Sequence, residues 1–125
     1  MTGKEYPPVD FTIEAERVAA FAKALGLEVG DGVPPTFAAV YSLGAAAPYL
    51  FGDPEAAINF AKLLHAEQEF EWTRHPTVGE TVTSRGRIAS DTERRGMRFV
   101  GYEVETTGSD GAPLCRSRAL FVIRA

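Results

Sequence analysis

The stretch from Phe37 to Phe51 contains no charged residue, and this feature constrains the fold more than any other. With Thr36 as its cap, the stretch predicts a helix from Phe37 to about Tyr49. A helix that is apolar on every side must be buried. Its small residues let other backbone approach closely: Ala38, Ala39, Gly44, Ala45, Ala46 and Ala47. The rest of the chain is therefore expected to cover this helix.

Alternating polar and apolar residues after this helix predict a sheet. The run from Leu63 to Trp72 places Gln68, Phe70 and Trp72 on one face of a strand and three glutamates on the other. Turn signals rich in Gly and Pro, and one polar hairpin tip, separate this run from three others with the same period, at 81–89, 97–107 and 112–123. The four runs predict sequential antiparallel strands from about residue 64 to 123.

The front of the chain predicts three shorter elements and a loop. Residues 9–11 are expected to form a short first strand, and Ile13 to Leu25 an amphipathic helix capped by Thr12. Residues 26–35 contain three glycines and two prolines, which predicts a loop. Asp53, as a cap followed by proline, predicts a short third helix that extends to about Lys62.

This order of elements favours one α+β architecture. A single antiparallel sheet wrapped around the long apolar helix uses short connections and covers the helix on most sides. That arrangement is the hot-dog fold. A length of 125 residues favours one such domain over residues 1–125.

Composition narrows the classes of function. A net charge of -4 and a pI of about 5.2 provide no basic field for nucleic acid or anionic membrane. The single cysteine, Cys115, allows neither an internal disulfide nor a multi-thiolate metal site. The N-terminus lacks the apolar core of a signal peptide, and the apolar stretch is shorter than the roughly 20 residues that span a bilayer. We expect a soluble cytoplasmic protein without cofactor, nucleic-acid partner or membrane partner.

Four segments together resemble the N-terminal, non-catalytic half of the MaoC-like dehydratases, which also occurs as a free subunit of mycobacterial (R)-3-hydroxyacyl-thioester dehydratases. These segments are Val33–Phe37, Leu64–Trp72, Pro76–Glu80 and Gly111–Arg124. The likeness covers nearly the whole chain, with a short 26–35 loop as its one departure. It implies reversible hydration of a trans-2-enoyl thioester. In catalytic members, an Asp and a His five positions apart hold the reacting water.

That Asp–His pair is absent from this sequence. The residues five positions after Asp10, Asp31, Asp53, Asp91 and Asp110 are Ala15, Thr36, Ile58, Gly96 and Cys115. The resemblance then implies a non-catalytic subunit that binds the acyl chain of an acyl-CoA or acyl-ACP thioester. Its implied partner is a catalytic MaoC-like chain that carries the pair, in a heterodimer or heterotetramer. A homodimer is expected when the chain is alone.

The resemblance implies a substrate-binding set and no catalytic or metal-binding residue. The set is Pro35, Phe37, Tyr41, Phe60, His65 and Gln68. For three of these residues a structural role is an open alternative. His65 could be a satisfied structural histidine, Tyr41 could pack in the core, and Gln68 could bond the end of the buried helix.

Other polar residues carry weaker signals. His75 is expected to be a solvated loop residue, and two histidines ten positions apart make a poor metal site. The arginines at 85, 87, 116 and 118 and the glutamates at 103 and 105 predict a cross-strand charge ladder on a solvated face. Arg94 and Arg95 are either contacts for the phosphates of a thioester carrier or a solvated hairpin tip.

Two further functions compete with the dehydratase subunit. One is a homodimeric acyl-thioester binding module without chemistry. The other is a stand-alone hot-dog thioesterase, a class whose members often resemble each other in an Asp or Glu on the buried helix. The absence of any acid between Phe37 and Phe51 counts against the thioesterase.

Overall fold

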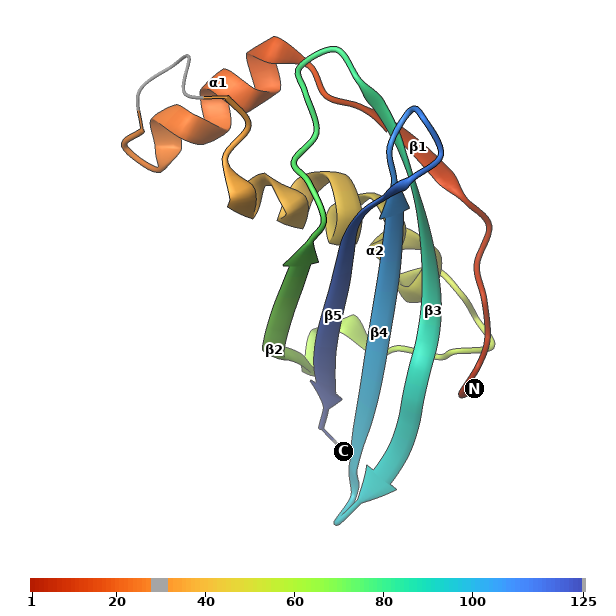
Figure 1. Ribbon diagram of the computed structural model, residues 1–125. Helices are drawn as coiled ribbons and strands as arrows, with labels where there is room; N and C mark the ends of the chain where they lie inside the picture. Colours follow the sequence, from red (N-terminus) through yellow and green to blue (C-terminus); the bar gives the residue numbers. More distant parts are fainter. Residues whose placement is uncertain (28–31, 125) are drawn as a thin grey trace.

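The computed structural model describes residues 1–27 and 32–124, which form a five-stranded antiparallel sheet curved over a central helix (Figure 1). The order of strands across the sheet is β1-β3-β4-β5-β2. The strands are β1 Val9–Thr12, β2 Leu63–Trp72, β3 Thr81–Arg94, β4 Met97–Thr107 and β5 Pro113–Ile123. The predicted α+β hot-dog architecture, a sheet wrapped around an apolar helix, is confirmed.

The central helix is built from three short pieces. A 3-10 turn at Pro35–Phe37 leads into a π-helical turn at Ala39–Leu43, and the α-helix α2 at Gly44–Phe51 follows. A separate helix, α1 at Ala15–Ala24, lies beyond one end of α2 (Figure 1). A 3-10 turn at Phe60–Lys62 leads into β2. The sequence predicted an apolar helix packed under the sheet, but not its change of winding or the exposed side formed by Ala39, Gly44, Pro48 and Tyr49.

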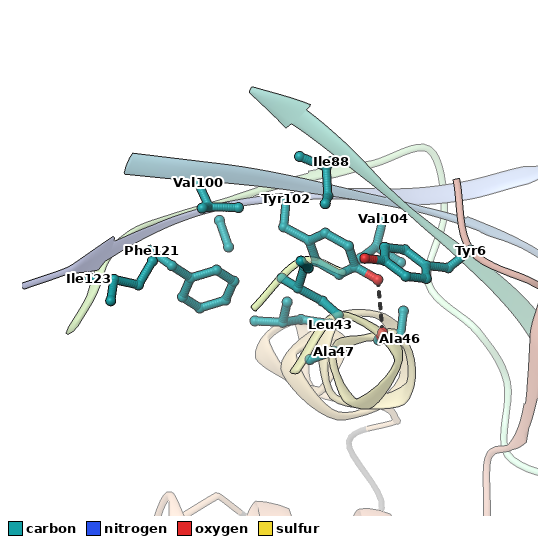
Figure 2. Packing of buried hydrophobic residues seen from close by; sticks show 13 residues of the cluster. Tyr6, Leu43, Ala46, Ala47, Ile88, Val100, Tyr102, Val104, Phe121 and Ile123 are labelled. Carbon is teal, nitrogen blue, oxygen red and sulfur yellow. Dashed lines mark hydrogen bonds between the residues drawn. The ribbon is translucent and has the colours of Figure 1, made fainter. Parts of the chain in front are cut away.

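The core lies between α2 and the concave face of the sheet (Figure 2). Every second residue of the central strands points inward, as the alternation predicted. Tyr102 is 1% exposed, and its hydroxyl donates a 2.8 Å hydrogen bond to the Ala46 carbonyl of α2. Gly86 on β3 leaves the space that this tyrosine fills, since a Cβ there would collide with its hydroxyl. The tyrosine therefore joins helix and sheet by packing and by a hydrogen bond.

The helix caps were predicted wrongly. Glu14, not Thr12, precedes α1, and the Thr12 hydroxyl lies 2.9 Å from that of Thr81 across the sheet. Pro34 precedes the central helix, and no side chain of the described residues caps it. The predicted third helix from Asp53 is a series of turns, with only Phe60–Lys62 as a 3-10 turn. In the predicted 26–35 loop, residues 28–31 lie outside the described residues.

Arg98 binds the segment after Asp53, which is not a helix. Its guanidinium forms a two-bond ion pair with Asp91, at 2.9 and 2.8 Å, and donates to the Ala56 carbonyl at 2.5 Å and the Ala57 carbonyl at 3.3 Å. Ala57 has a φ of 51°, which an α-helix does not accept. The left-handed backbone at Ala57 ends any helix there, and Arg98 holds the segment against the sheet.

One edge of the sheet is covered by the N-terminal segment, and the other edge is open. Beyond β1, the N-terminal residues 3–6 continue along the edge of β3, where Gly3 donates to Ile88 at 2.7 Å and Tyr6 donates to Gly86 at 2.9 Å. Ile88 returns a 2.9 Å bond to the Lys4 carbonyl. The opposite edge, β2, pairs with β5 alone among the described strands. An uncovered strand edge is a template for another chain.

Within the described residues, no helix has both the length and the apolar character needed to cross a membrane. The same part of the chain contains no cluster of three or more His, Cys, Asp or Glu side chains suited to a metal ion.

Candidate functional site

The candidate site follows the concave side of β2, the open edge of the sheet. A β-bulge between His65 and Glu67 shifts the register against β5, so that Gln68, Phe70 and Trp72 point inward after it. Gln68 and Phe70 are half-buried, whereas Trp72 is 37% exposed. The predicted two faces of this strand are therefore present, and its inner face is left partly open.

His65 and Gln68 belong to one hydrogen-bonded chain that leads into the core. The His65 Nε2 atom lies 3.0 Å from the Gln68 side-chain carbonyl oxygen. The Gln68 amide donates to the buried Ser117 hydroxyl of β5 at 2.8 Å and to the Glu69 carbonyl at 3.1 Å. These contacts fix the orientation of both side chains. The alternative prediction for Gln68 was a hydrogen bond to the end of the buried helix. Its side-chain amide binds Ser117 of β5 instead.

Aromatic rings surround the start of β2. Phe60 is 66% exposed, and its ring centroid lies 5.3 Å from that of Phe51 at the end of α2. Phe51 in turn lies 5.2 Å from Phe121, and the His65 ring lies 4.9 Å from the same phenylalanine. An exposed phenylalanine at the end of such a cluster marks a surface that favours apolar contact.

The other predicted residues lie at the opposite end of the buried helix. Phe37 and Tyr41 are each 1% exposed and contribute to a core cluster with Cys115 of β5. Pro35, which begins the 3-10 turn, is exposed. The structure thus separates the six predicted residues into two groups of three. Phe70 lies between the two groups. It is two positions after Gln68 on the same face of β2, and it packs against the core cluster that contains Phe37 and Tyr41.

Two hydroxyl groups on the π-helical turn are buried without a hydrogen-bond partner among the described residues. They belong to Tyr41 and Ser42. Burial raises the pKa of the Tyr41 phenol far above its usual value, and burial also raises the pKa of the nearby Cys115 thiol. Neither group is therefore ionised near neutral pH. π-helical turns often occur at functional sites, and an unpaired buried hydroxyl is costly unless something else binds it.

A buried carboxylate that the sequence did not indicate holds the loops at the far end of β2. Glu80 is 9% exposed and accepts from the Arg74 guanidinium at 3.0 and 2.5 Å, from the Thr77 amide at 3.1 Å and from the Ser109 amide at 2.9 Å. The Arg74 guanidinium holds the pKa of the Glu80 carboxyl well below its usual range. Only the turn residues Pro76 and Gly79 signalled a loop here, and neither indicated a charged centre.

The described residues bring together a surface for apolar chains but no pair for proton transfer. A groove of about 400 Å³ lies at the ends of β2, β4 and β5. It is lined by the inner-face residues Trp72 and Cys115 and also by the charged outer-face residues Glu71, Glu105 and Arg116. His75 is an exposed loop residue, as predicted, and its ring lies tilted against that of Trp72 with a centroid distance of 5.6 Å. Apolar contact surface is provided by the exposed rings of Phe60 and Trp72, beside and on the inner face of β2.

The chain belongs to the FAS1-like dehydratase domain family, because its residues 32–117 match the family described as "FAS1-like, dehydratase domain region". Among curated relatives, the UPF0336 protein Lxx02810 of Leifsonia xyli subsp. xyli is 35% identical over 120 residues, which cover 94% of this chain and 73% of the relative. A UPF0336 protein of Saccharopolyspora erythraea is 25% identical over 138 residues, which cover 98% and 88% of the two chains.

Solved structures share the fold. A chain of the HadBC (3R-hydroxyacyl-ACP dehydratase) complex from Mycobacterium tuberculosis superposes with a TM-score of 0.75 and 21% identity, over 97% of this chain and 96% of that one. A chain of the ChsH1-ChsH2 complex from the same organism gives a TM-score of 0.71 at 12% identity, over 96% and 84% of the two chains. A MaoC-like dehydratase superposes with a TM-score of 0.81 at 16% identity. The superposition covers 99% of this chain and 42% of the dehydratase chain.

Proposed function

We propose that this chain is the non-catalytic, acyl-chain-binding subunit of a heteromeric (R)-specific enoyl-thioester hydratase, or 3-hydroxyacyl-thioester dehydratase. The observation that carries the proposal is an open β2 edge, with exposed apolar side chains, in a dehydratase-family chain without the Asp–His pair. A partner chain is needed to supply the reacting water and its base. Two structural neighbours are chains of complexes, the HadBC (3R-hydroxyacyl-ACP dehydratase) complex and the ChsH1-ChsH2 complex, and this supports a partner.

In this proposal the partner's sheet joins at β2 and places its Asp–His loop beside Pro34 to Tyr41. The acyl tail of an acyl-CoA or acyl-ACP thioester lies along the inner face of β2, between Phe60 at one end and Tyr41 at the other. His65 and Gln68 act as fixed polar groups of the wall, because their hydrogen bonds hold them in place. Phe37 is packed beneath this region, and Pro35 is exposed at its rim.

Co-expression with a MaoC-like chain that carries the Asp–His pair tests the proposal. Hydration of crotonyl-CoA and of a longer enoyl-CoA is measured for each chain and for the purified complex. We expect negligible turnover for this chain alone and turnover in the usual enzymatic range, about 1 to 1000 per second, for the complex. Enzymatic turnover by this chain alone would contradict the proposal.

A surface variant separates binding at the edge from general damage to the fold. Phe60→Glu places a charge at the exposed aromatic beside β2 and is expected to weaken association of the two chains by roughly tenfold or more, about 1.4 kcal/mol. Leu25→Glu is the matched control, because Leu25 is 52% exposed just after α1. Equal association of both variants would show that this edge does not bind the partner.

A homodimeric acyl-thioester module is the second candidate, because the same edge is self-complementary about a two-fold axis. The mass of the assembly and the hydration activity distinguish this module from the dehydratase subunit. A stable homodimer that binds acyl-CoA and neither associates with a catalytic chain nor supports hydration would favour it.

A further inference from the structure

The outer, convex face of the sheet has a regular pattern in four registered rows across β2, β5, β4 and β3. Two rows are charged and two contain mostly uncharged residues. The charged rows are Glu69–Arg118–Glu103–Arg87 and Glu71–Arg116–Glu105–Arg85. The other rows are Leu64–Val122–Phe99–Thr92 and Glu67–Leu120–Gly101–Ser90.

Each charged row alternates acid, base, acid, base. Several neighbours on the central strands are in contact, whereas Glu71 and Arg85, at the two ends of one row, make no ion pair among the described residues. Arg116 donates to Glu105 at 2.9 Å, Arg118 to Glu103 at 3.4 Å and Arg87 to Glu103 at 3.3 Å. The predicted charge ladder is therefore confirmed for Arg87, Arg116 and Arg118. The central charges are paired within the sheet, so covering them does not leave them buried without partners, whereas Glu71 and Arg85 need a partner from the covering surface.

The apolar rows leave aliphatic and aromatic surface on the same face. Val122, Leu120 and Phe99 are only half-buried, although they lie on central strands. Leu64 is 62% exposed at the end of its row. Arg94 lies over the Phe99 ring at 5.5 Å from its centroid. Several apolar side chains in adjacent rows form a patch, which a solvated sheet face normally avoids.

The pattern is self-complementary about one two-fold axis. This axis runs parallel to the strands, between β4 and β5. Each row of one copy then faces the same row of the second copy, with β4 opposite β5 and β3 opposite β2. Every acid in a charged row then faces a base of the second copy. The resulting contacts pair Arg118 with Glu103, Arg116 with Glu105, Glu69 with Arg87, Glu71 with Arg85 and Val122 with Phe99.

A two-fold axis that lies in the interface but runs perpendicular to the strands does not produce complementary contacts. It exchanges the outermost charged row with the outermost apolar row, so that Val122 faces Arg116 and Phe99 faces Glu105. Apolar groups would then desolvate charges without new partners. The distribution of side chains therefore selects one geometry for self-association.

We propose that the outer face of the sheet binds the outer face of a second copy of this chain, about the two-fold axis parallel to the strands between β4 and β5. Two sheets packed in this way keep their strands nearly aligned, about 10 Å apart. The contact is centred on β4 and β5, because both outer faces are convex where the sheet curves over α2 (Figure 1). It is independent of the β2 edge and goes beyond the proposed function: pairs made at β2 become tetramers.

Chemical cross-linking with a short bis-maleimide tests the geometry in a Cys115→Ala background. Val122→Cys lies next to the axis, so chains with this change are expected to link to each other. Glu69→Cys mixed with isotope-labelled Arg87→Cys is expected to yield the mixed product, since these positions face one another. Arg87→Cys alone is the control, because its two copies lie on opposite sides of the axis. A linked Arg87→Cys pair, or the absence of the mixed product, would overturn the proposal.

A charge-reversal series tests the complementarity by sedimentation and native mass spectrometry. Arg116→Glu with Arg118→Glu makes like charges face each other, and we expect loss of the tetramer with retention of the β2 pair and of the circular dichroism spectrum. Adding Glu103→Arg and Glu105→Arg to the same chain restores opposite signs and is expected to restore the tetramer. A folded wild-type protein that never exceeds a pair, and whose pair survives Arg116→Glu with Arg118→Glu, would overturn the proposal. A fourfold variant that fails to recover the assembly would also overturn it.

Discussion

At the scale of single residues, long-range polar contacts decide the local structure. Asp53 shows this directly, because it was expected to start a helix and instead binds the N-terminal segment. Its carboxylate accepts from Tyr6 at 2.7 Å and lies 2.6 Å from the Lys4 ammonium. The Lys4 ammonium and the Tyr6 hydroxyl lower the pKa of Asp53 from 3.8 to about 2.

The stability provided by Asp53 should depend on pH in a defined window. A carboxyl whose pKa is lowered by folding stabilises the protein fully above its unfolded pKa, here 3.8, and this stabilisation is lost as pH falls through about 2. Asp53→Asn is therefore expected to be less stable than wild type at neutral pH, with a gap that closes between about pH 4 and pH 2. Urea unfolding at several pH values measures the gap.

Glu55→Gln is the matched control for this experiment. Its carboxylate lies 3.6 Å from the same Lys4 ammonium, but its side chain is 78% exposed. An exposed pair contributes little, so the stability of this variant should follow that of wild type at every pH. A gap between Asp53→Asn and wild type that stays constant with pH would contradict the assigned role of the carboxylate.

At the scale of elements, the winding of the central helix leads to an unusual prediction. An exposed glycine in a helix is normally improved by alanine, by about 0.5 to 1 kcal/mol. Gly44 is exposed, but it follows the π-helical turn, and a Cβ there would lie 2.8 Å from the Ala39 carbonyl oxygen. We expect Gly44→Ala to destabilise the protein by about 1 to 3 kcal/mol, the usual cost of overpacking.

Chemical denaturation decides the sign of this effect. Ala45→Gly, at the next and half-buried position of α2, is expected to cost only the ordinary propensity difference of about 0.5 to 1 kcal/mol. If Gly44→Ala stabilises the protein, the π-helical turn does not constrain this position.

The strands were predictable because alternation depends only on neighbouring residues, and every predicted run is present. The caps and the third helix were not, because Thr12, Asp53 and the Ala56 carbonyl are bound by residues distant in sequence. For the candidate site, the pattern indicated the inner face of β2. It could not indicate the Glu80 network, whose partners Arg74 and Ser109 come from two separate turns.

At the scale of the whole molecule, the N-terminal segment determines which edge is open. Deletion of residues 1–8 would expose the groups of Ile88 and Gly86 that this segment now binds, so that β3 gains a free edge. We expect the truncated protein to aggregate at temperatures below its unfolding transition, because uncovered edges recruit other chains. Light scattering against time measures this.

A control keeps the backbone cover while it removes side-chain contacts. Lys4→Ala with Tyr6→Ala deletes the bonds to Asp53 but leaves a main chain that is able to pair with β3. It should lose stability without rapid aggregation. Equal aggregation of both proteins at matched stability would show that the exposed edge is not the cause.

The order of pairing in the sheet also determines how the chain meets its surroundings during synthesis. Gln68 of β2 reaches its partner Ser117 across 49 positions, and Asp10 binds Thr83 across 73. Such distant pairings form slowly, and neither edge strand has a partner until much later residues have left the ribosome. The charge-free segment of the central helix is made before the strands that cover it. The nascent chain therefore presents a bare apolar helix to the cell, and we expect it to depend on a chaperone until β5 has been made.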